Sequence, residues 1–357
     1  MSWLGLRIKD DLVLDPDRDE ATGQSQGVDE HDFHAQGTIL CQFEYHPVAR
    51  RQNLLRYAVR SPWPSSLIIC ADPDGTFHLL QGQSDRSVSA SVQTDLIDTD
   101  VTLMISVGWD APARLGVFTV FAPDLGALYQ TEFRSPLPLS KRDVSNLLRL
   151  PTVTLQTTSA AFLAVSDAKE PVGPSCSIEA GAAIRTPYGA TAIEDIRPGS
   201  LVLTHGGDVA QVRWVGSQLL PAAGRHTPMM LRDPYYDLCT DLVVSTEARL
   251  MLNGSEIEYL FGEEAVSVSV GHLGLRKSIA RVTTGPLLRY FHVLLDRPDV
   301  LVVNGAAVES LDASAVLNDR ANLPHSVLAD LPPELLPMSQ RPMFPVLKEF
   351  EALSLSR

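Results

Sequence analysis

The sequence predicts a mostly β protein of two domains, an N-terminal antiparallel β-sandwich and a C-terminal all-β unit. Three observations lead to this prediction. The chain has 357 residues, more than one hydrophobic core ordinarily holds. Its apolar residues fall in short runs separated by turns rich in glycine and proline, a pattern typical of antiparallel strands. Between the two halves, residues 151–175 lose this periodicity and contain paired prolines, which indicates an interdomain linker.

Composition narrows the class of protein. Hydrophobic residues make up 45% of the chain, which argues against wholesale disorder. The formal net charge is −14, and no basic cluster or zinc-finger spacing occurs, so we expect no nucleic-acid partner. No run of eighteen apolar residues is present, so we expect no membrane span. The four cysteines are far apart and predict no disulfide framework: Cys41, Cys70, Cys176 and Cys239.

The first residues, 1–35, are acidic and irregular, and we interpret them as a solvated arm. The opening "MSWLGLRIKDDLVLDPDRDE" has no apolar core and no small-residue cleavage site, so we expect no signal peptide. The chain would then be cytoplasmic or exported by a route that needs none. His31 and His34 could form half of a metal site, but the polar surroundings favour exposed histidines, and we expect no metal and no cofactor.

Residues 36–150 carry the strands of the predicted sandwich. "GTILCQFEYH" alternates apolar and polar residues, and "SLIICADPDGTFHLLQG" forms a hairpin around a proline and glycine turn at Asp72–Gly75. "DVTLMISVGWDAPARLGVFTVFAPD" repeats this arrangement, with its turn near Pro112. "SKRDVSNLLRL" predicts a helix with Ser140 as its N-cap and Asp143 in its first turn.

This half resembles the concanavalin A-like, or laminin-G-like, lectin sandwich, through "LIICADPDGTFHLL" and "VGWDAPARLGVFTVF". The resemblance is diffuse and covers roughly residues 35–150. It implies a protein that binds sugars, but no sequence feature marks a sugar site. Asp72, Asp74 and Asp110 could bind calcium; their positions in turns and at a strand end favour purely structural carboxylates.

The second domain, residues 176–313, opens with a different turn-rich pattern. "AAIRTPYGATAI" predicts a hairpin with its turn at Pro187–Gly189, and "SLVLTHGGDVAQVRWVGSQLL" predicts another with its turn at Gly206–Gly207. Both hairpins follow "SCSIEAG", which contains Cys176. The unit is therefore expected to be all-β.

The stretch "CSIEAGAAIRTPYGATAIEDIRPGSLVLTHGGDVAQVRWVG" resembles the start of a bacterial Hint domain, the self-processing fold of hedgehog proteins and inteins. "DLVVSTEARLMLNG", "GHLGLRKSI" and "YFHVLLDRPDVLVVNGAAVESL" resemble the family's later blocks in the same order. The resemblance implies that a cysteine at the first position attacks the preceding carbonyl and converts an amide into a thioester. A Thr/Ser-x-x-His element polarises the bond and protonates the leaving nitrogen.

These roles fall on Cys176 as nucleophile and on Ser245 as the hydroxyl residue, but the histidine of the element is replaced by Ala248. A methyl group donates no proton, and such acid catalysis is worth about 10²–10⁴-fold in rate. His272 and His292 lie in family-like blocks, and His292 is our candidate for a replacement acid, although buried hydrogen-bonded histidines are the more ordinary interpretation. A second family histidine is replaced by Pro298.

Cys176 has a second interpretation, since free cysteines are commonly packed as small buried residues. The sequence favours a degenerate Hint domain over an active one, and predicts that Ala248→His restores some cleavage. The remaining tail, residues 314–357, is proline-rich with short helical pieces, and "FPVLKEFEALSL" fits either a segment lying across the domain or a helix that binds a partner.

Three function classes follow. The first is a binding or structural protein, not a turnover enzyme, whose partner is an unidentified protein or glycan and whose Hint domain no longer cleaves. The second is an autoproteolytic protein that cuts before Cys176 through a thioester. The third is an exported surface protein that binds glycans through its sandwich.

Overall fold

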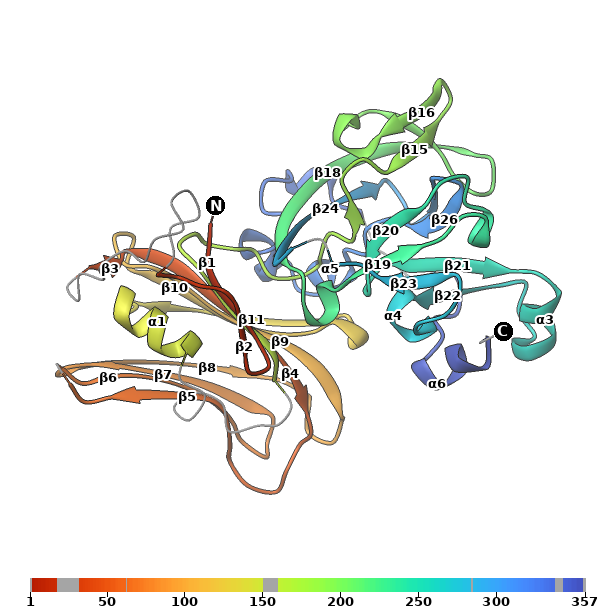
Figure 1. The fold of residues 1–357 in the computed structure, drawn as a ribbon. Coiled ribbons are helices and arrows are strands. Elements are labelled where there is room, and N and C mark those ends of the chain that lie inside the picture. Colours follow the sequence, from red (N-terminus) through yellow and green to blue (C-terminus); the bar gives the residue numbers. More distant parts are fainter. Residues whose placement is uncertain are drawn as a thin grey trace. The chain divides into compact units, whose positions relative to one another are not determined.

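The computed structural model describes residues 2–17, 32–61, 63–149, 160–283, 285–337 and 343–355. The chain divides into two compact units, Met1–Gly173 and Pro174–Arg357. Antiparallel sheets dominate both units (Figure 1), as the sequence predicts.

The N-terminal unit is a sandwich of two antiparallel sheets. The larger sheet has the strand order β11-β10-β9-β4-β13-β1-β2, and the smaller has the order β5-β6-β7-β8 (Figure 1). The strands of the larger sheet are β1 (Trp3–Ile8), β2 (Asp11–Leu14), β4 (Gln36–Tyr45), β9 (Val101–Asp110), β10 (Leu115–Ala122), β11 (Ala127–Arg134) and β13 (Ala160–Ser166). Those of the smaller are β5 (Gln52–Val59), β6 (Ser65–Ala71), β7 (Thr76–Gln83) and β8 (Arg86–Gln93). A third, two-stranded sheet pairs β3 (Phe33–His34) with β12 (Leu139–Ser140), and a short 3-10 helix, η1 (Pro123–Leu125), follows β10.

Large side chains from both sheets fill the space between them. Phe43 and Phe118 come from the larger sheet and Phe77 from the smaller, and all three are fully buried. This is the packing expected when alternating strands turn their apolar faces toward each other. The predicted helix is α1 (Lys141–Arg149). Its predicted cap is confirmed, because the hydroxyl of Ser140 accepts from the Asp143 amide at 3.0 Å.

Two predicted boundaries do not hold in this unit. Residues 160–166, expected in a linker, form β13, which pairs with β4 on one side and β1 on the other. β1 itself lies in the range expected to be a solvated arm. "AAFLAVS" is a mostly apolar run without alternation, and its last five residues are all buried, as expected for an inner strand that is covered on both faces. Residues 151–159 of the expected linker, and His31, lie outside the described residues.

The C-terminal unit contains two larger sheets, with the orders β17-β18-β24-β14-β20-β19-β23 and β16-β15-β25-β26-β21-β22. The first sheet contains β14 (Ile178–Glu179), β17 (Leu201–Leu203), β18 (Val209–Pro221), β19 (Pro228–Leu231), β20 (Leu242–Ser245), β23 (Ile279–Arg281) and β24 (Leu287–Leu295). The second contains β15 (Ala183–Thr186), β16 (Gly189–Ala192), β21 (Arg249–Asn253), β22 (Ala265–Ser269), β25 (Val300–Val303) and β26 (Ala306–Glu309). Helices in this unit are short: η2 (Ile193–Asp195), η3 (Gly224–His226), η4 (Tyr235–Asp237), α3 (Ser255–Phe261), α4 (Val270–Leu273), α5 (Ser314–Asn318), η5 (Arg320–His325), η6 (Pro333–Leu335), α6 (Glu349–Ala352) and η7 (Leu353–Leu355).

Both predicted hairpins of this unit are confirmed. β15 pairs with β16 around Pro187–Tyr188, and β17 pairs with β18 around the two-glycine turn. Gly207 has a φ of 86°, a conformation that favours glycine, and its amide donates to the carbonyl of Thr204 at 3.0 Å.

The tail packs on its own unit. Val346 pairs with Ser267 of β22, and Leu347, Ala352 and Leu355 join the main hydrophobic core. The described part of the tail therefore fits the prediction of a segment lying across the domain. Its buried side chains already pack in the core of that unit. In the part of the chain that the structure describes, no helix combines the length and the apolar character needed to cross a bilayer.

Candidate functional site

Cys176 lies just before β14 and is fully buried, packed with Leu220 and Tyr290. Its backbone N–H donates to Oε1 of Gln218 at 2.9 Å. Its thiol donates to the carbonyl oxygen of Gly216, with a sulfur–oxygen distance of 3.6 Å. Both contacts come from β18, so this strand holds the thiol and the nitrogen of the bond between residues 175 and 176.

Burial is the largest influence on this thiol, and it raises the pKa of Cys176, with the hydrogen bond to Gln218 offsetting only part of the effect. The thiol is therefore protonated at neutral pH. Because the thiolate is the attacking species in acyl transfer, deprotonation needs a base next to the sulfur. The group that the thiol contacts, the Gly216 carbonyl, is a hydrogen-bond acceptor but not a useful base.

Ser245 lies at the end of β20, beside the residue that follows the candidate nucleophile. Its N–H donates to the carbonyl of Ser177 at 2.8 Å, and its hydroxyl accepts from the amide of Glu247 at 3.3 Å. Ala248 closes the same turn, donating its N–H to the Ser245 carbonyl at 3.1 Å. The Ala248 side chain is 1% exposed and belongs to the main core, whereas Cys176 packs in a separate cluster.

His292, on β24, uses both ring nitrogens within the described structure. Nδ1 lies 2.9 Å from the hydroxyl of Ser177, and Nε2 lies 3.2 Å from the carbonyl oxygen of Glu309. Burial lowers the pKa of His292 to about 4, against the smaller raising effect of the backbone contacts with Glu309 and Ser310. The ring is therefore neutral at neutral pH. Since a carbonyl only accepts, the single N–H sits on Nε2, and Nδ1 accepts from Ser177.

These contacts bring Ser245 and His292 to the same residue, Ser177, next to Cys176. They do not give either side chain a contact with the Cys176 nitrogen, whose hydrogen-bond acceptor is Gln218. His272 lies elsewhere, on α4, where its Nδ1 has no partner among the described residues.

Sequence reasoning missed an ion pair beside this site. Arg225, on η3, places Nε 2.5 Å from Oε1 of Glu247, and both side chains are largely buried. Thr246 donates its hydroxyl to the carbonyl of Arg225 at 2.6 Å, which fastens η3 to the turn after β20. Two opposite charges separated by 22 residues in two different loops give no local sequence signal, so only the folded chain reveals the pair.

Glu247 also contacts the residue before the candidate nucleophile. Burial alone would raise its pKa, but Arg225, His226 and a hydrogen bond from the Ser175 hydroxyl together lower the pKa of Glu247 below its usual value. An ionised carboxylate thus contacts the residue whose carbonyl would be attacked. An attacked carbonyl becomes an oxyanion, and its stabilisation requires donors or positive charge. The Ser175 side chain is held by a negative group instead.

The cysteines are expected to differ sharply in reactivity. Cys239 is exposed, whereas Cys41, Cys70 and Cys176 are buried, and burial raises the pKa of each buried thiol. A maleimide reagent should therefore modify the native protein once, at Cys239, and four times after unfolding, as followed by mass spectrometry and peptide mapping. Rapid labelling of Cys176 in the native protein would contradict the closed site described above.

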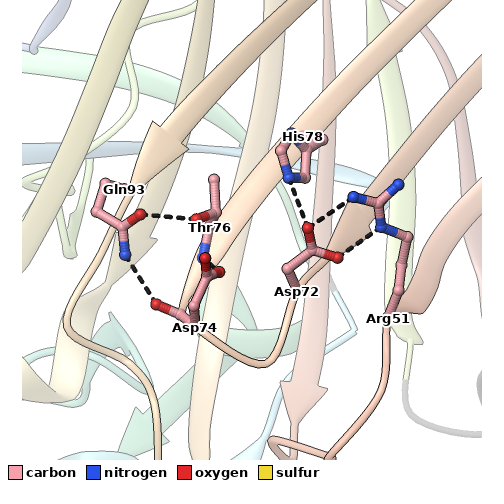
Figure 2. Close-up of polar contacts among 6 residues, drawn as sticks. All are labelled: Arg51, Asp72, Asp74, Thr76, His78 and Gln93. Carbon is pink, nitrogen blue, oxygen red and sulfur yellow. Dashed lines mark hydrogen bonds and ion pairs between the residues drawn. The ribbon is translucent and has the colours of Figure 1, made fainter.

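In the sandwich, the acidic turn after β6 is occupied by its own neighbours (Figure 2). Both oxygens of Asp72 accept from the guanidinium of Arg51, at 2.5 and 2.6 Å, and His78 lies 3.0 Å from the same carboxylate. The Arg51 hydrogen bond, followed by that of His78, outweighs desolvation and lowers the pKa of Asp72 to about 2. Asp74 accepts from the amide of Thr76 at 3.0 Å, as in an Asx turn.

Asp110, the third candidate calcium ligand, is likewise held by neighbouring residues of the chain. Asp110 accepts from the amide of Ala113 at 2.9 Å and pairs with Lys169 at 3.1 Å. His34 lies in β3, and its backbone carbonyl accepts from the indole of Trp109 at 2.8 Å. Among the described residues, no group of three or more histidine, cysteine, aspartate or glutamate side chains is arranged to hold a metal ion.

Comparison with known proteins gives one family match and several similar solved structures. The family model described as "Hint domain" matches residues 176–315. The chain is similar to a bacterial intein-like domain from Clostridium thermocellum, with 11% identity, a TM-score of 0.28, and coverage of 38% of this chain and 99% of that one. It is similar to the gp41-1 intein with 13% identity, a TM-score of 0.26, and coverage of 39% and 100%.

The chain is also similar to the CBM40 domain of the Ruminococcus gnavus IT-sialidase, with 14% identity, a TM-score of 0.27, and coverage of 37% of this chain and 76% of that one. None of the curated proteins matches the chain. The family match begins at Cys176, the residue that the sequence analysis assigned to the start of the second domain. Residues 176–315 are a Hint domain, and the chain is a Hint domain-containing protein with an N-terminal β-sandwich.

Proposed function

We propose that this Hint domain no longer cleaves its chain and that the protein acts as a binding or structural protein. The observation that carries the proposal is the hydrogen bond from the Cys176 N–H to Oε1 of Gln218. This nitrogen must leave when the thioester forms, and the group facing it is a carboxamide oxygen. A neutral carboxamide accepts that hydrogen bond but supplies no proton at neutral pH.

The bonds and the proton that move in the acyl shift explain why this nitrogen needs a proton donor. The sulfur of Cys176 would bond to the carbonyl carbon of Ser175, the C–N bond would break, and the proton of the thiol would have to reach the departing nitrogen. The thiol contacts the Gly216 carbonyl, and the nitrogen contacts the Gln218 carboxamide. Neither group can take the proton from the sulfur and deliver it to the nitrogen. Each missing acid or base costs about 10²–10⁴-fold in rate. The neutral His292, whose N–H points to Glu309, does not replace either group.

Retention of the nucleophile favours the second candidate, self-cleavage before Cys176, in which Cys176, Ser245 and His292 form the catalytic set. Cys176 stands at the first matched position, and Ser245 and His292 both contact Ser177. For the sandwich we propose a concanavalin A-like binding module; its two antiparallel sheets support this. Display of that module at a cell surface as a glycan-binding domain is the third candidate.

Comparison of the wild type with Cys176→Ala separates the first two candidates. With different tags at the two ends, both proteins should migrate as one full-length chain after expression. The alanine variant cannot form a thioester but keeps a small apolar side chain at the site. A shorter species that carries either tag in the wild type, and is missing from Cys176→Ala, would establish self-cleavage and contradict the proposal.

A further inference from the structure

The sandwich unit contains a pocket of about 520 Å³ at the ends of several strands. Its lining includes Phe33 of β3, Gln83 and Arg86 at the β7–β8 turn, Arg114 at the β9–β10 turn, and Ser135 after β11. The volume lies in the range of small-molecule sites. The pocket is part of the N-terminal unit alone, so what it binds goes beyond the proposal for the Hint domain and does not depend on it.

The rim of this pocket is held in a conformation that is uncommon outside glycine. Ser84, Arg114 and Ser135 have φ values of 55°, 55° and 52°. Backbone hydrogen bonds fix all three: the amide of Ser84 donates to Pro64 at 2.8 Å, that of Arg114 to Ala111 at 3.1 Å, and that of Ser135 to Arg114 at 3.1 Å. Left-handed residues of this kind concentrate at ligand sites, where a fixed backbone pre-arranges the side chains.

The two arginines of the pocket contrast with two other arginines of this unit. Arg51 and Arg149 bind aspartates, as expected in a chain of net charge −14. Arg86 and Arg114 are exposed and form no side-chain hydrogen bond or ion pair with any residue that the structure describes. Two free guanidinium groups lining one pocket attract an anion, and their planar fork matches a carboxylate.

Other lining groups suit a ring. Phe33 is 38% exposed, and its ring stacks on Trp63 with a centroid distance of 6.3 Å. Gln83 donates its amide to the carbonyl of Pro138 at 3.1 Å, which leaves its oxygen as an acceptor.

We propose that this pocket binds a small carboxylate whose carboxyl group is attached to a ring. The carboxylate pairs with Arg86 and Arg114, and one ring face packs against Phe33. Two sources supply this chemistry, an acidic sugar and a non-sugar ring acid. They differ in the hydroxyl groups that Gln83 and Ser135 can bind.

Isothermal titration calorimetry of the full chain tests the proposal with three probes, D-glucuronate, cyclohexanecarboxylate and D-glucose. We expect a dissociation constant of about 1 mM or tighter for at least one carboxylate and no measurable binding of glucose. Stronger binding of glucuronate identifies the sugar as the source, and stronger binding of cyclohexanecarboxylate identifies the non-sugar acid. Equal binding of glucose, or no binding of either carboxylate, overturns the proposal.

Three variants complete the test. Arg86→Gln and Arg114→Gln should each weaken carboxylate binding by about tenfold or more, because each loses a charge-assisted hydrogen bond. Arg56→Gln, a change at an exposed arginine of β5 outside the pocket lining, should leave it unchanged. All three positions are exposed, so the melting temperature should stay within a few degrees of the wild type. Equal affinities of all three variants and the wild type would contradict the assigned site.

Discussion

Replacing Gln218 with histidine is expected to make the protein cleave itself before Cys176 in the presence of a thiol, roughly 10²–10⁴-fold faster than the wild type. The carboxamide of Gln218 already contacts the Cys176 nitrogen at 2.9 Å, and an imidazole Nε2 reaches a similar distance from the backbone. Unlike the carboxamide oxygen, an imidazole that carries its proton on Nε2 can deliver that proton to the leaving nitrogen. Dithiothreitol or hydroxylamine then traps the thioester, and mass spectrometry detects a fragment of residues 1–175.

Two controls belong with this experiment. Gln218→Asn keeps a neutral amide and should remain intact. The double variant Gln218→His with Cys176→Ala has a proton donor but no nucleophile, and it should also remain intact. If Gln218→His folds like the wild type and cleaves no faster over days, the missing proton donor is not what silences the site.

The sequence-based prediction for Ala248→His is less direct. The Ala248 side chain is 1% exposed within the main core, so an imidazole there must displace packed neighbours. We therefore expect less cleavage from Ala248→His than from Gln218→His, together with a lower melting temperature. Faster cleavage by Ala248→His would show that position 248, and not position 218, controls the leaving nitrogen.

Removal of Arg225 is expected to destabilise the C-terminal unit by about 3 kcal/mol or more, because it leaves the buried carboxylate of Glu247 without its partner. Arg225→Met should lower the melting transition of that unit in calorimetry of the full chain and leave the sandwich transition in place. The double variant Arg225→Met with Glu247→Leu should recover most of the loss, since no buried charge remains.

The pH dependence of this effect has a defined sign. The pKa of Glu247 is lowered by folding, so its stabilising contribution is present above the pKa of an unfolded glutamate and is lost as pH falls through the lower folded value. In Arg225→Met the same carboxyl is buried without its guanidinium partner, which penalises its ionised form and raises its pKa. The stability difference between wild type and variant should therefore shrink as the pH falls from neutrality, first through the raised pKa of the variant's carboxyl and then through the lowered pKa of the wild-type one. A difference that stays constant from neutral pH to pH 3 would mean that the charge of Glu247 does not cause it.

Sequence patterns predicted the elements whose signals are local. The hairpin of β15 and β16, the two-glycine turn before β18, and the cap of α1 by Ser140 all depend on residues within a few positions of one another. β13 was missed because it is an inner strand whose partners, β1 and β4, lie more than 100 residues earlier and whose uniform apolar run shows no alternation.

The residues of the candidate site also fall into two groups, those with a sequence signal and those without one. Cys176 and Ser245 could be assigned from blocks of sequence, and the loss of the histidine at Ala248 was visible there too. Gln218 could not be assigned, because its contact with Cys176 spans 42 residues and depends on the long strand β18. Nothing local distinguishes its amide from the other polar residues of that strand.

Intact-mass measurement of the purified wild-type chain tests the central claim most directly. The protein is incubated at neutral pH with hydroxylamine, which cuts any thioester that forms between Ser175 and Cys176. The account predicts a single species of 38.9 kDa throughout, since neither the thiol nor the leaving nitrogen has a group to exchange its proton with. Accumulation of two fragments, residues 1–175 and 176–357, would contradict it and establish this Hint domain as self-cleaving.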